Sequence, residues 1–413
     1  MNGAANHTTA GPSGNPAGSA ASASPRQSSP VVLQVLPSLV TGGAERGAID
    51  VAVALAQAGG TPIVASAGGP MVRELDRWGI RHVALPLASK NPLVMRRNAG
   101  RLAELIGETG ARIVHARSRA PAWSALFAAR RTGARFMTTF HAPYNFDGRL
   151  KRLYNSVMAR GERVIAISEF IRAHILENYD TDPAAIRVIH RGIDVDLFSP
   201  ERVSQERLIQ LARAWGVPDD RHVVMLPGRL TRWKGQLVLV EALARLGRRD
   251  ICCLLVGSDQ GRTGYRREIE EAVARHDLGG VVRIVDHCSD MPAAYLLADV
   301  VVNASSDPEA FGRVIVEAQA MGKPVIVSNH GAVRETVLAG ETGWVVPPGD
   351  PAALAAALDE ALSLDAGARD ALAAQARAFV TGRFTRERMC RDTLAVYAEL
   401  LAGEATPPPN RLA

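Results

Sequence analysis

The chain has 413 residues, of which 47% are hydrophobic and 22% are charged, and its formal net charge is +6 at pH 7. This length exceeds what one ordinary hydrophobic core requires, which favours two domains. No run of 18 residues is both apolar and uncharged, which argues against a spanning helix, and the four cysteines lack metal-ligand spacing. We therefore expect a globular protein of a reducing compartment, with the cysteines as small buried residues.

The first 30 residues differ from the rest in composition. Residues 1–30 are rich in Ala, Ser, Gly, Pro and Asn, contain Arg26 and no acidic residue, and lack the apolar segment of a secretory signal. A disordered tail is the simplest interpretation. A transit peptide, which normally carries more arginine, is the alternative.

Short β-branched runs alternate with Ala- and Leu-rich helical stretches from residue 31 onward. The first series of expected strands covers 31–37, 62–66, 81–86, 112–116, 135–141, 163–168 and 186–190, with a helix from Ala44 to about Ala58. The second series covers 222–228, 251–257, 281–287, 299–305, 324–328 and 343–347. Strands that alternate with helical crossovers form parallel, doubly wound sheets, so the sequence predicts an α/β protein with two such domains.

The rhythm is interrupted over 191–221, which we expect to be the hinge. We place an N-terminal domain at 31–200 and a C-terminal domain at 201–385. A final amphipathic helix with a frayed end occupies 386–413, and whether it crosses back to the first domain is left open. Ligands of doubly wound sheets bind beyond the carboxyl ends of the strands, so the cleft between the domains is the expected site.

The two halves of the chain differ in charge. Residues 31–200 hold 22 Lys and Arg against 14 Asp and Glu, whereas residues 201–413 hold 25 against 28. A basic first half indicates an anionic partner. Arg117, Ser118 and Arg119 follow an expected strand end there, and we predict that they contact an anionic or hydroxyl-rich acceptor.

A basic helix is expected over 148–163 in the same half. Its apolar side is formed by Leu150, Leu153, Val157 and Met158. The segment is either an ordinary amphipathic surface helix or an element that lies on an anionic membrane.

The stretch LVTGGAERGA at 39–48 follows the first expected strand. Gly42 and Gly43 have no side chain, so a ligand can approach their backbone and the amides of the following helix. The stretch lacks both the GxGxxG pattern and the acidic residue of a dinucleotide site, and an ordinary tight turn is the alternative.

The stretch LPGRLTRWKGQ at 226–236 places Arg229 and Lys234 between a strand and a helix that starts near Gly235. A guanidinium binds two oxygens and an ammonium adds a point charge, so this pair is suited to hold a diphosphate. Arg232, between them, is expected to face solvent. Ordinary surface charge is the alternative interpretation.

The stretch DPEAFGRVIVEAQAMGKPVIVS at 307–328 separates Glu309 from Glu317 by seven residues. A helix is expected to begin near Gly312, and the amides of its first turn create a positive end. Glu309 beside that end can accept hydrogen bonds from sugar hydroxyls, and Glu317 within the helix can meet a ribose diol. A solvated helix face is the alternative, but the apolar neighbours of Glu317 argue against it.

These segments together resemble one family. PEAFGRVIVEAQAMGKPVIVS looks like the E-x7-E signature of retaining GT-B glycosyltransferases of family four, and GRLTRWKG is similar to the family's G-R-L-x-x-x-K-G element. GGAER, TTFHAPY, VIHRGIDVDLFSP and HGAVRETVLAGETGWVVPPGDPAALAAAL resemble its glycine loop, strand-end histidine, interdomain segment and late second domain. The resemblance covers roughly 31–400 and implies the GT-B fold, in which two Rossmann-like domains face each other across a cleft. It further implies that the domain at 31–200 binds the acceptor and that the domain at 201–385 binds the nucleotide sugar.

The resemblance implies catalytic roles for four residues. Arg229 and Lys234 would neutralise the diphosphate of the donor, and Glu309 would hold the hydroxyls of its sugar. His141, at the end of an expected strand, would lie over the donor sugar; a histidine with a purely structural role is the alternative.

Donor binding is implied for seven further residues, which are Gly43, Phe311, Gly312, Arg313, Glu317, Asp286 and His287. The carboxylate of Glu317 would bind the ribose. The segment 311–313 would offer backbone amides to sugar and phosphate, and Gly43 would lie against the phosphates or the acceptor. The base would lie near Asp286 and His287.

One position departs from the family pattern, and one motif is set aside. HRGID carries Arg191 where the family commonly has Asn, which leaves the role of this position open. DVD at 194–196 is similar to the metal-binding motif of the other large glycosyltransferase fold. It lies in the interdomain segment, and Arg229 and Lys234 already supply the countercharge, so we expect no metal site.

We therefore expect a retaining hexosyltransferase that moves a sugar from a nucleotide diphosphate sugar to an acceptor hydroxyl without a metal or other cofactor. A UDP-sugar is favoured as donor and a GDP-sugar is second. The acceptor is expected to be a glycan or a lipid-linked sugar, as in lipopolysaccharide-type synthesis, at the cytoplasmic, inner face of a membrane, with no nucleic acid as partner. A nucleotide-sugar epimerase or hydrolase on the same fold, and a two-lobed sugar-binding protein, are the alternatives.

Overall fold

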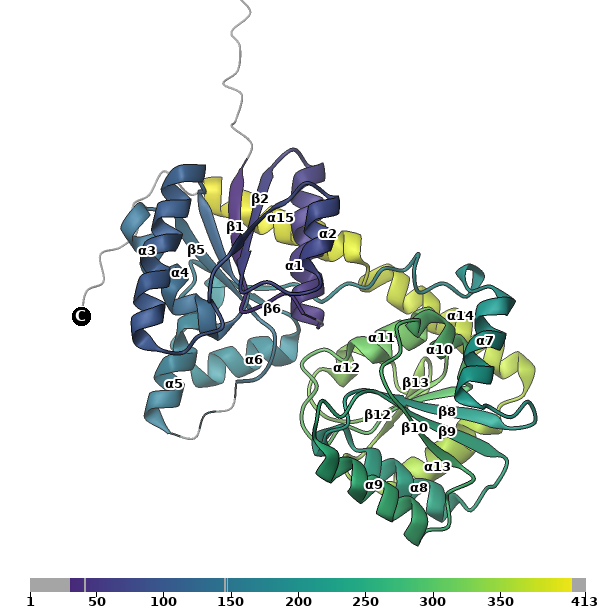
Figure 1. Cartoon of the computed structure of the whole chain (residues 1–413). Coiled ribbons are helices and arrows are strands. Elements are labelled where there is room, and N and C mark those ends of the chain that lie inside the picture. Colours follow the sequence, from purple (N-terminus) through teal and green to yellow (C-terminus); the bar gives the residue numbers. More distant parts are fainter. Residues whose placement is uncertain (1–29, 41, 145, 147, 403–413) are drawn as a thin grey trace, which may run out of the picture.

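The computed structural model describes residues 30–40, 42–144, 146 and 148–402, and it shows two α/β domains, each built on one parallel sheet (Figure 1). The two doubly wound domains predicted from the sequence are thus confirmed. The tail expected at 1–30, apart from Pro30, and the frayed end expected after residue 402 lie outside the described residues.

The first sheet has the strand order β3-β2-β1-β4-β5-β6-β7. Its strands are β1 (Val31–Val35), β2 (Thr61–Ser66), β3 (Arg81–Ala84), β4 (Ile113–Ala116), β5 (Arg135–Phe140), β6 (Arg163–Ala166) and β7 (Ile186–Val188). The helical segments between them are α1 (Gly43–Gln57), α2 (Val72–Arg77), α3 (Pro92–Thr109), α4 (Arg119–Thr132), α5 (Arg149–Asn155), η1 (Ser156–Ala159), α6 (Glu169–Asn178) and η2 (Pro183–Ala185). The chain order reverses between β1 and β4, the place where such sheets bind ligands.

The second sheet has the strand order β10-β9-β8-β11-β12-β13. Its strands are β8 (His222–Pro227), β9 (Ile251–Val256), β10 (Val282–Val285), β11 (Val300–Asn303), β12 (Val325–Ser328) and β13 (Gly343–Val346). Its helical segments are η4 (Arg232–Lys234), α8 (Gln236–Leu246), α9 (Thr263–Arg275), α10 (Met291–Leu297), α11 (Arg313–Ala320), α12 (Val333–Thr336), α13 (Pro351–Leu362) and α14 (Ala366–Arg383). Every position of β9 is buried, including the free thiols of Cys252 and Cys253, because helices cover both faces of a parallel sheet.

The segment expected to be the hinge, 191–221, contains a short turn, η3 (Pro200–Arg202), and a helix, α7 (Gln205–Trp215). The hydroxyl of Ser204 caps α7 by accepting a hydrogen bond from the amide of Arg207. The guanidinium of Arg207 pairs with the carboxylate of Asp290, which caps α10, so α7 belongs to the C-terminal domain.

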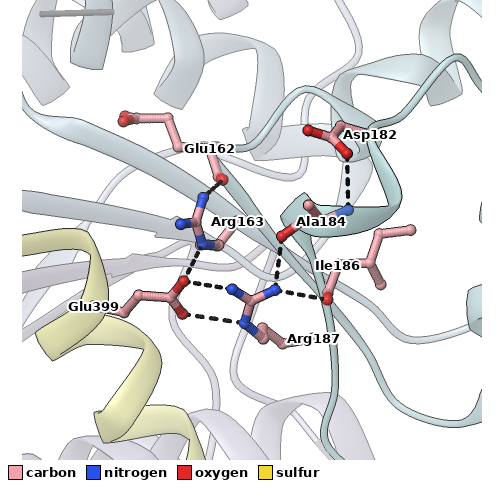
Figure 2. Close-up of polar contacts among 7 residues, drawn as sticks. All are labelled: Glu162, Arg163, Asp182, Ala184, Ile186, Arg187 and Glu399. Atoms are coloured by element: carbon pink, nitrogen blue, oxygen red, sulfur yellow. Dashed lines mark hydrogen bonds and ion pairs between the residues drawn. The ribbon is translucent and has the colours of Figure 1, made fainter. Parts of the chain in front are cut away.

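The last helix, α15 (Arg386–Ala402), crosses back and packs on the N-terminal domain, as its yellow ribbon shows (Figure 1). Tyr397 and Leu400 are buried there against residues of the first sheet. The carboxylate of Glu399 accepts hydrogen bonds from Arg163 at 2.8 Å and Arg187 at 2.5 Å, at the start of β6 and within β7 (Figure 2).

The two crossings between the domains lie side by side. The amide of Ile193 donates to the carbonyl of Phe384, and the amide of Arg386 donates to the carbonyl of Ile193, both at 2.8 Å. The hinge is therefore two paired extended segments rather than one linker.

The basic helix expected over 148–163 is shorter than predicted. It consists of α5 followed by η1, and its apolar residues divide between two environments. Leu150 and Leu153 are 83% and 53% exposed, whereas Val157 and Met158 are fully buried beneath the first sheet domain's helices. The predicted single apolar side along this segment is therefore wrong. The side chains of η1 point in a different direction from those of α5.

Candidate functional site

A cleft of about 440 Å³ lies between the two domains. The N-terminal wall is made by the start of α1 and by α2, and the C-terminal wall is made by the first turns of α11. Arg46 and Glu74 form a bidentate ion pair, with distances of 2.6 and 2.7 Å, that joins α1 to α2 on this wall.

Glu309 lies in the loop between β11 and α11 and is only 8% exposed. Its Oε1 accepts hydrogen bonds from the ammonium of Lys234, from the hydroxyl of Ser305 at 2.8 Å, and from the amide of Asn303 at 3.1 Å. We call these four residues the Glu309 cluster. Sequence reasoning found Glu309 and Lys234 but missed Asn303 and Ser305; the signal was a polar pair directly at the end of an apolar strand.

The Glu309 carboxylate is held ionised. Burial alone would raise its pKa, but the charge of Lys234 and the hydrogen bonds from Lys234, Asn303 and Ser305 outweigh burial and hold the pKa below its usual range. A buried carboxylate in this state is a hydrogen-bond acceptor and a weak base.

Glycine makes the Glu309 cluster possible. Gly235, which precedes α8, has a φ of 74°, and a Cβ there would lie 1.9 Å from the carbonyl oxygen of Ala304. Gly331 has a φ of 75°, and a Cβ there would lie 2.3 Å from the carbonyl oxygen of Glu309. Only glycine permits both close approaches, which bring Lys234 and Glu309 together from separate loops.

Arg229 follows β8 and is exposed. Its guanidinium has no hydrogen bond or ion pair to any residue that the structure describes, while its carbonyl accepts a bond from Gln236 at 3.0 Å. Arg232 pairs with Glu268 on α9 and is exposed, as expected. Lys234 therefore lies on Glu309, whereas Arg229 remains available to a ligand.

Glu317 lies in the fifth position of α11 and is 8% exposed. Its carboxylate accepts a hydrogen bond from the hydroxyl of Tyr295 at 2.9 Å and pairs with Arg313 at 3.0 Å. Burial and the Glu317 charge raise the pKa of Tyr295 well above its usual range, so its hydroxyl stays a donor. Sequence reasoning missed Tyr295.

Gly43, the first residue of α1, packs against two arginine side chains. A Cβ on Gly43 would lie 2.1 Å from Nη1 of Arg191 and 3.1 Å from Cδ of Arg313. Nη2 of Arg191 lies 2.8 Å from Nδ1 of His141. The position that departs from the family pattern is thus in the cleft, where sequence reasoning had left its role open.

His141 is neutral. Burial and the charges of Arg191 and Arg117 hold its pKa well below the usual range. Nδ1 accepts a hydrogen bond from Nη2 of Arg191, so Nε2 carries the ring proton. Nε2 is buried and has no partner among the described residues.

Arg117 follows β4 and is 5% exposed. Its Nε donates to Gln34 at 2.7 Å, while its Nη2 is buried without a partner in the described part of the chain. A narrow cavity is lined by Arg117, His141, Arg191 and Arg313, which we call the Arg191 cluster. Arg119, by contrast, bonds Asn155 and stacks on Tyr144, which gives it a structural role, and Ser118 caps no amide of α4.

The remaining predicted residues are spread around the C-terminal domain. Phe311 is buried against Phe384, and Gly312, with a φ of 80°, precedes α11, so the helix begins at Arg313 rather than at Gly312. Asp286 and His287 are exposed at the end of the edge strand β10, and Asp286 pairs with Arg266 at 3.1 Å. They contact neither Glu317 nor the Glu309 cluster within the described residues.

The DVD motif has a structural role. Asp194 pairs with Arg386 at 2.5 Å and accepts hydrogen bonds from the amides of Asp196 and Leu197. In the described ranges, no group of three or more His, Cys, Asp and Glu residues is placed to hold a metal ion. No described helix is long and apolar enough to cross a bilayer.

The carboxylate of Glu335 joins the two domains. Glu335 of α12 accepts hydrogen bonds from the first amides of α6, those of Glu169 at 2.7 Å and Phe170 at 2.9 Å, and from His190 at 2.8 Å. Ser168 Oγ donates to the carbonyl of Ala310 at 2.8 Å. These contacts bring the loop of Glu309 against the N-terminal domain.

Two family matches divide the chain in the same way as the domains. Residues 41–197 match Glycosyltransferase Family 4, and residues 210–379 match Glycosyl transferases group 1. The structure of a glycosyltransferase from Rickettsia africae ESF-5 is 41% identical in sequence to this chain and superposes on it with a TM-score of 0.85. The match covers 91% of this chain and 99% of the Rickettsia chain.

More distant relatives share parts of the sequence or the fold. A D-inositol 3-phosphate glycosyltransferase of Salinispora tropica is 32% identical over 263 residues, which are 60% of this chain and 53% of that protein. The chain thus spans about half the length of the curated relatives it matches. Anabaena HepE, whose structure was solved in complex with UDP-glucose, is 24% identical in sequence to this chain and superposes on it with a TM-score of 0.79. The match covers 89% of this chain and 99% of the HepE chain. The GT-B fold predicted from the sequence is thereby confirmed.

Proposed function

Because this chain belongs to the family 4, group 1 glycosyltransferases, we propose that it transfers a sugar from a nucleotide diphosphate sugar to an acceptor hydroxyl with retention of the anomeric configuration. The observation that carries this proposal is the Glu309 cluster, in which a buried, ionised carboxylate and an ammonium meet from two adjacent loops. Sugar transfer needs both groups: a carboxylate can orient the hydroxyls of the sugar, and an ammonium can neutralise the leaving diphosphate.

The departing diphosphate is the first requirement. We assign its stabilisation to Arg229, whose guanidinium is unpaired among the described residues, and to Lys234, which can share its protons between Glu309 and a phosphate oxygen. The amides that precede α11 face the same charge at the positive end of that helix. We propose that these groups suffice without a metal ion.

The donor sugar is the second requirement. The Glu309 carboxylate would accept hydrogen bonds from its hydroxyls, and His141 would lie over the sugar. Glu317, held by Tyr295 and Arg313, would accept the ribose hydroxyls. Because Glu309 is a weak base, we propose that the acceptor attacks on the face that the diphosphate leaves, and that the diphosphate takes the acceptor proton.

A turnover assay tests the proposal. UDP-glucose is the first donor to assay, because a uridine nucleotide is favoured from the sequence and is the ligand in the HepE complex of the same fold. NMR should show an α-linked product from the α-donor in the presence of EDTA. A β-linked product would contradict retention, full loss of turnover in EDTA would contradict metal independence, and release of free or epimerised sugar with no acceptor dependence would favour the hydrolase or epimerase.

We further propose that the acceptor is presented at the cytoplasmic face of an anionic membrane, as in cell-surface glycan or lipopolysaccharide synthesis. The support is α5, where exposed Leu150 and Leu153 share a short helix with Arg149, Lys151 and Arg152. Sedimentation with phosphatidylglycerol vesicles should recover the protein, and the Leu150→Ser/Leu153→Ser variant should stay in the supernatant. Ile209→Ser, on exposed α7 of the other domain, is the control. Equal recovery of all three proteins would contradict the membrane contact.

A further inference from the structure

The Arg191 cluster contains three buried nitrogen atoms with nothing to bind. Nη2 of Arg117, Nε2 of His141 and Nε of Arg313 have no hydrogen-bond partner among the described residues. All three side chains line the same narrow cavity, which adjoins the cleft at Gly43 and Arg313. A buried donor without an acceptor costs about 1–3 kcal/mol, so three in one cavity indicate a missing partner.

Each unpaired atom is a donor. Guanidinium groups have no acceptor atom, and the only acceptor of His141, Nδ1, is occupied by Arg191. A group that pairs with all three atoms from the adjoining cleft must therefore supply acceptors. A deprotonated oxyanion meets this requirement better than a hydroxyl, which also brings a proton that needs an acceptor.

The electrostatics of the cavity point the same way. The guanidinium of Arg191 lies against Gly43, the first residue of the 15-residue helix α1, where the helix dipole is positive. Burial and the charges of Arg313 and Arg117 lower the pKa of Arg191 to about 9. A cation is disfavoured at such a place unless an anion joins it.

Three acidic groups lie near the Arg191 cluster, and none accepts a hydrogen bond from its unpaired nitrogen atoms. Glu317 is paired with Nη2 of Arg313, and Glu45 lies over Gly42 at the start of α1. Asp50, one turn further along α1, makes no hydrogen bond within the described residues, and burial raises its pKa to about 6. The charge of the cluster is therefore only partly balanced by the protein itself.

We propose that the Arg191 cluster is a second anion site, which binds a carboxylate or phosphate group of a substrate in addition to the donor diphosphate. This inference rests on the proposed function, and it goes further by stating that one reaction partner is anionic. Three of its members, Arg117, His141 and Arg191, follow strands β4, β5 and β7 of the N-terminal sheet, and the fourth, Arg313, begins α11, whereas the diphosphate groups Arg229 and Lys234 follow β8. The anion belongs either to the transferred sugar, as a uronate, or to the acceptor, as a phosphate.

Calorimetry on the full chain tests the site. The protein is first saturated with UDP, which fills the diphosphate site, and inorganic phosphate is then titrated at constant ionic strength. We expect phosphate to bind the UDP complex, and Arg191→Asn to weaken this binding by at least about tenfold, since one positive charge beside the anion is lost. Arg232→Asn, which removes an exposed arginine of the other domain, should leave phosphate affinity unchanged.

The outcomes separate the two proposals. If UDP binds and phosphate does not, or if Arg191→Asn binds phosphate as tightly as the unmodified protein, the second anion site is refuted while the proposed function stands. If neither UDP nor GDP binds, the proposed function fails, and phosphate titration of the free chain with Arg191→Asn still tests the cluster. Should Arg191→Asn fold poorly, Arg191→Lys gives a further comparison, because it keeps the charge and loses the planar guanidinium. Its affinity for phosphate should be intermediate.

The source of the anion follows from two further complexes. Phosphate that binds the UDP-glucose complex but is excluded from the UDP-glucuronate complex identifies the donor sugar as the carrier. Phosphate that binds both complexes identifies the acceptor. Phosphate that binds neither complex contradicts the site.

Discussion

On the C-terminal side of the site, which we call the C-terminal wall, Lys234 pairs with Glu309, and Nη2 of Arg313 pairs with Glu317. On the N-terminal wall, Arg117 and His141 keep buried donors unpaired, and Arg191 lies against the positive end of α1. The C-terminal wall is thus preorganised before any ligand arrives, whereas the N-terminal wall is complete only when an anion joins it. Paired charges suit hydroxyls, which exchange one hydrogen bond for another, and unpaired cations suit a charged group.

Lys234→Ala should break the C-terminal wall and have the largest effect. Turnover of the nucleotide sugar should fall by about 10²–10³-fold, since one preorganised group that stabilises developing charge is lost. Stopped assays at saturating donor measure this. The variant should also unfold more easily because Glu309 loses its cation, and adding Glu309→Gln should restore stability without restoring turnover. Turnover within threefold of the unmodified protein would contradict the role of Lys234.

Glu317→Gln should weaken donor binding on the same wall. We expect KM for the nucleotide sugar to rise about 10–100-fold with a smaller change in kcat, because a charged acceptor for the ribose is replaced by a neutral one. Tyr295→Phe is the matched control: it removes one hydrogen bond from Glu317 but keeps the carboxylate on Arg313, so KM should rise less. A change confined to kcat in Glu317→Gln would argue against ribose binding.

The two walls should also respond to pH with opposite signs. The folded pKa of Glu309 is below its unfolded value, so its contribution to stability is present above the unfolded pKa, about 4.5, and is lost as pH falls. The folded pKa of Asp50, about 6, is above the unfolded 3.8, so stability is highest below 3.8 and decreases as pH rises to 6. Asp50→Asn should therefore raise the free energy of unfolding above pH 6 by on the order of 2 kcal/mol and leave it unchanged below pH 4. Urea unfolding between pH 4 and 8 measures this, and no gain at pH 7 would contradict it.

Gly43→Ala should disturb the N-terminal wall with the smallest effect. The new Cβ would meet the ends of flexible arginine side chains, Nη1 of Arg191 at 2.1 Å and Cδ of Arg313 at 3.1 Å, so both can shift without unfolding α1. We expect turnover to fall by about 3–10-fold, as expected for displaced positioning groups, while the melting temperature changes little. Gly100→Ala, where nothing lies within 4 Å of the added Cβ, is the control. Equal turnover of both variants would show that Arg191 and Arg313 need not be held against α1.

Much of the fold was readable from local pattern. All thirteen predicted strands occur, because fully buried parallel strands appear as short apolar runs between glycine-rich turns. The error came where tertiary contacts decide: η1 turns Val157 and Met158 inward, whereas Leu150 and Leu153 stay exposed.

The sequence by itself determined which segments carry the chemistry, since Lys234 and Glu309 lie in loops that follow apolar strands and Glu317 lies in the helix that comes next. Only the tertiary structure decided which groups meet. Arg191 reaches His141 across 50 residues, and Lys234 reaches Glu309 across 75, because a parallel sheet brings the ends of strands that are distant in the chain to one edge. A local pattern contains no record of such distances, so the unpaired donors of the N-terminal wall became visible only once the chain was folded.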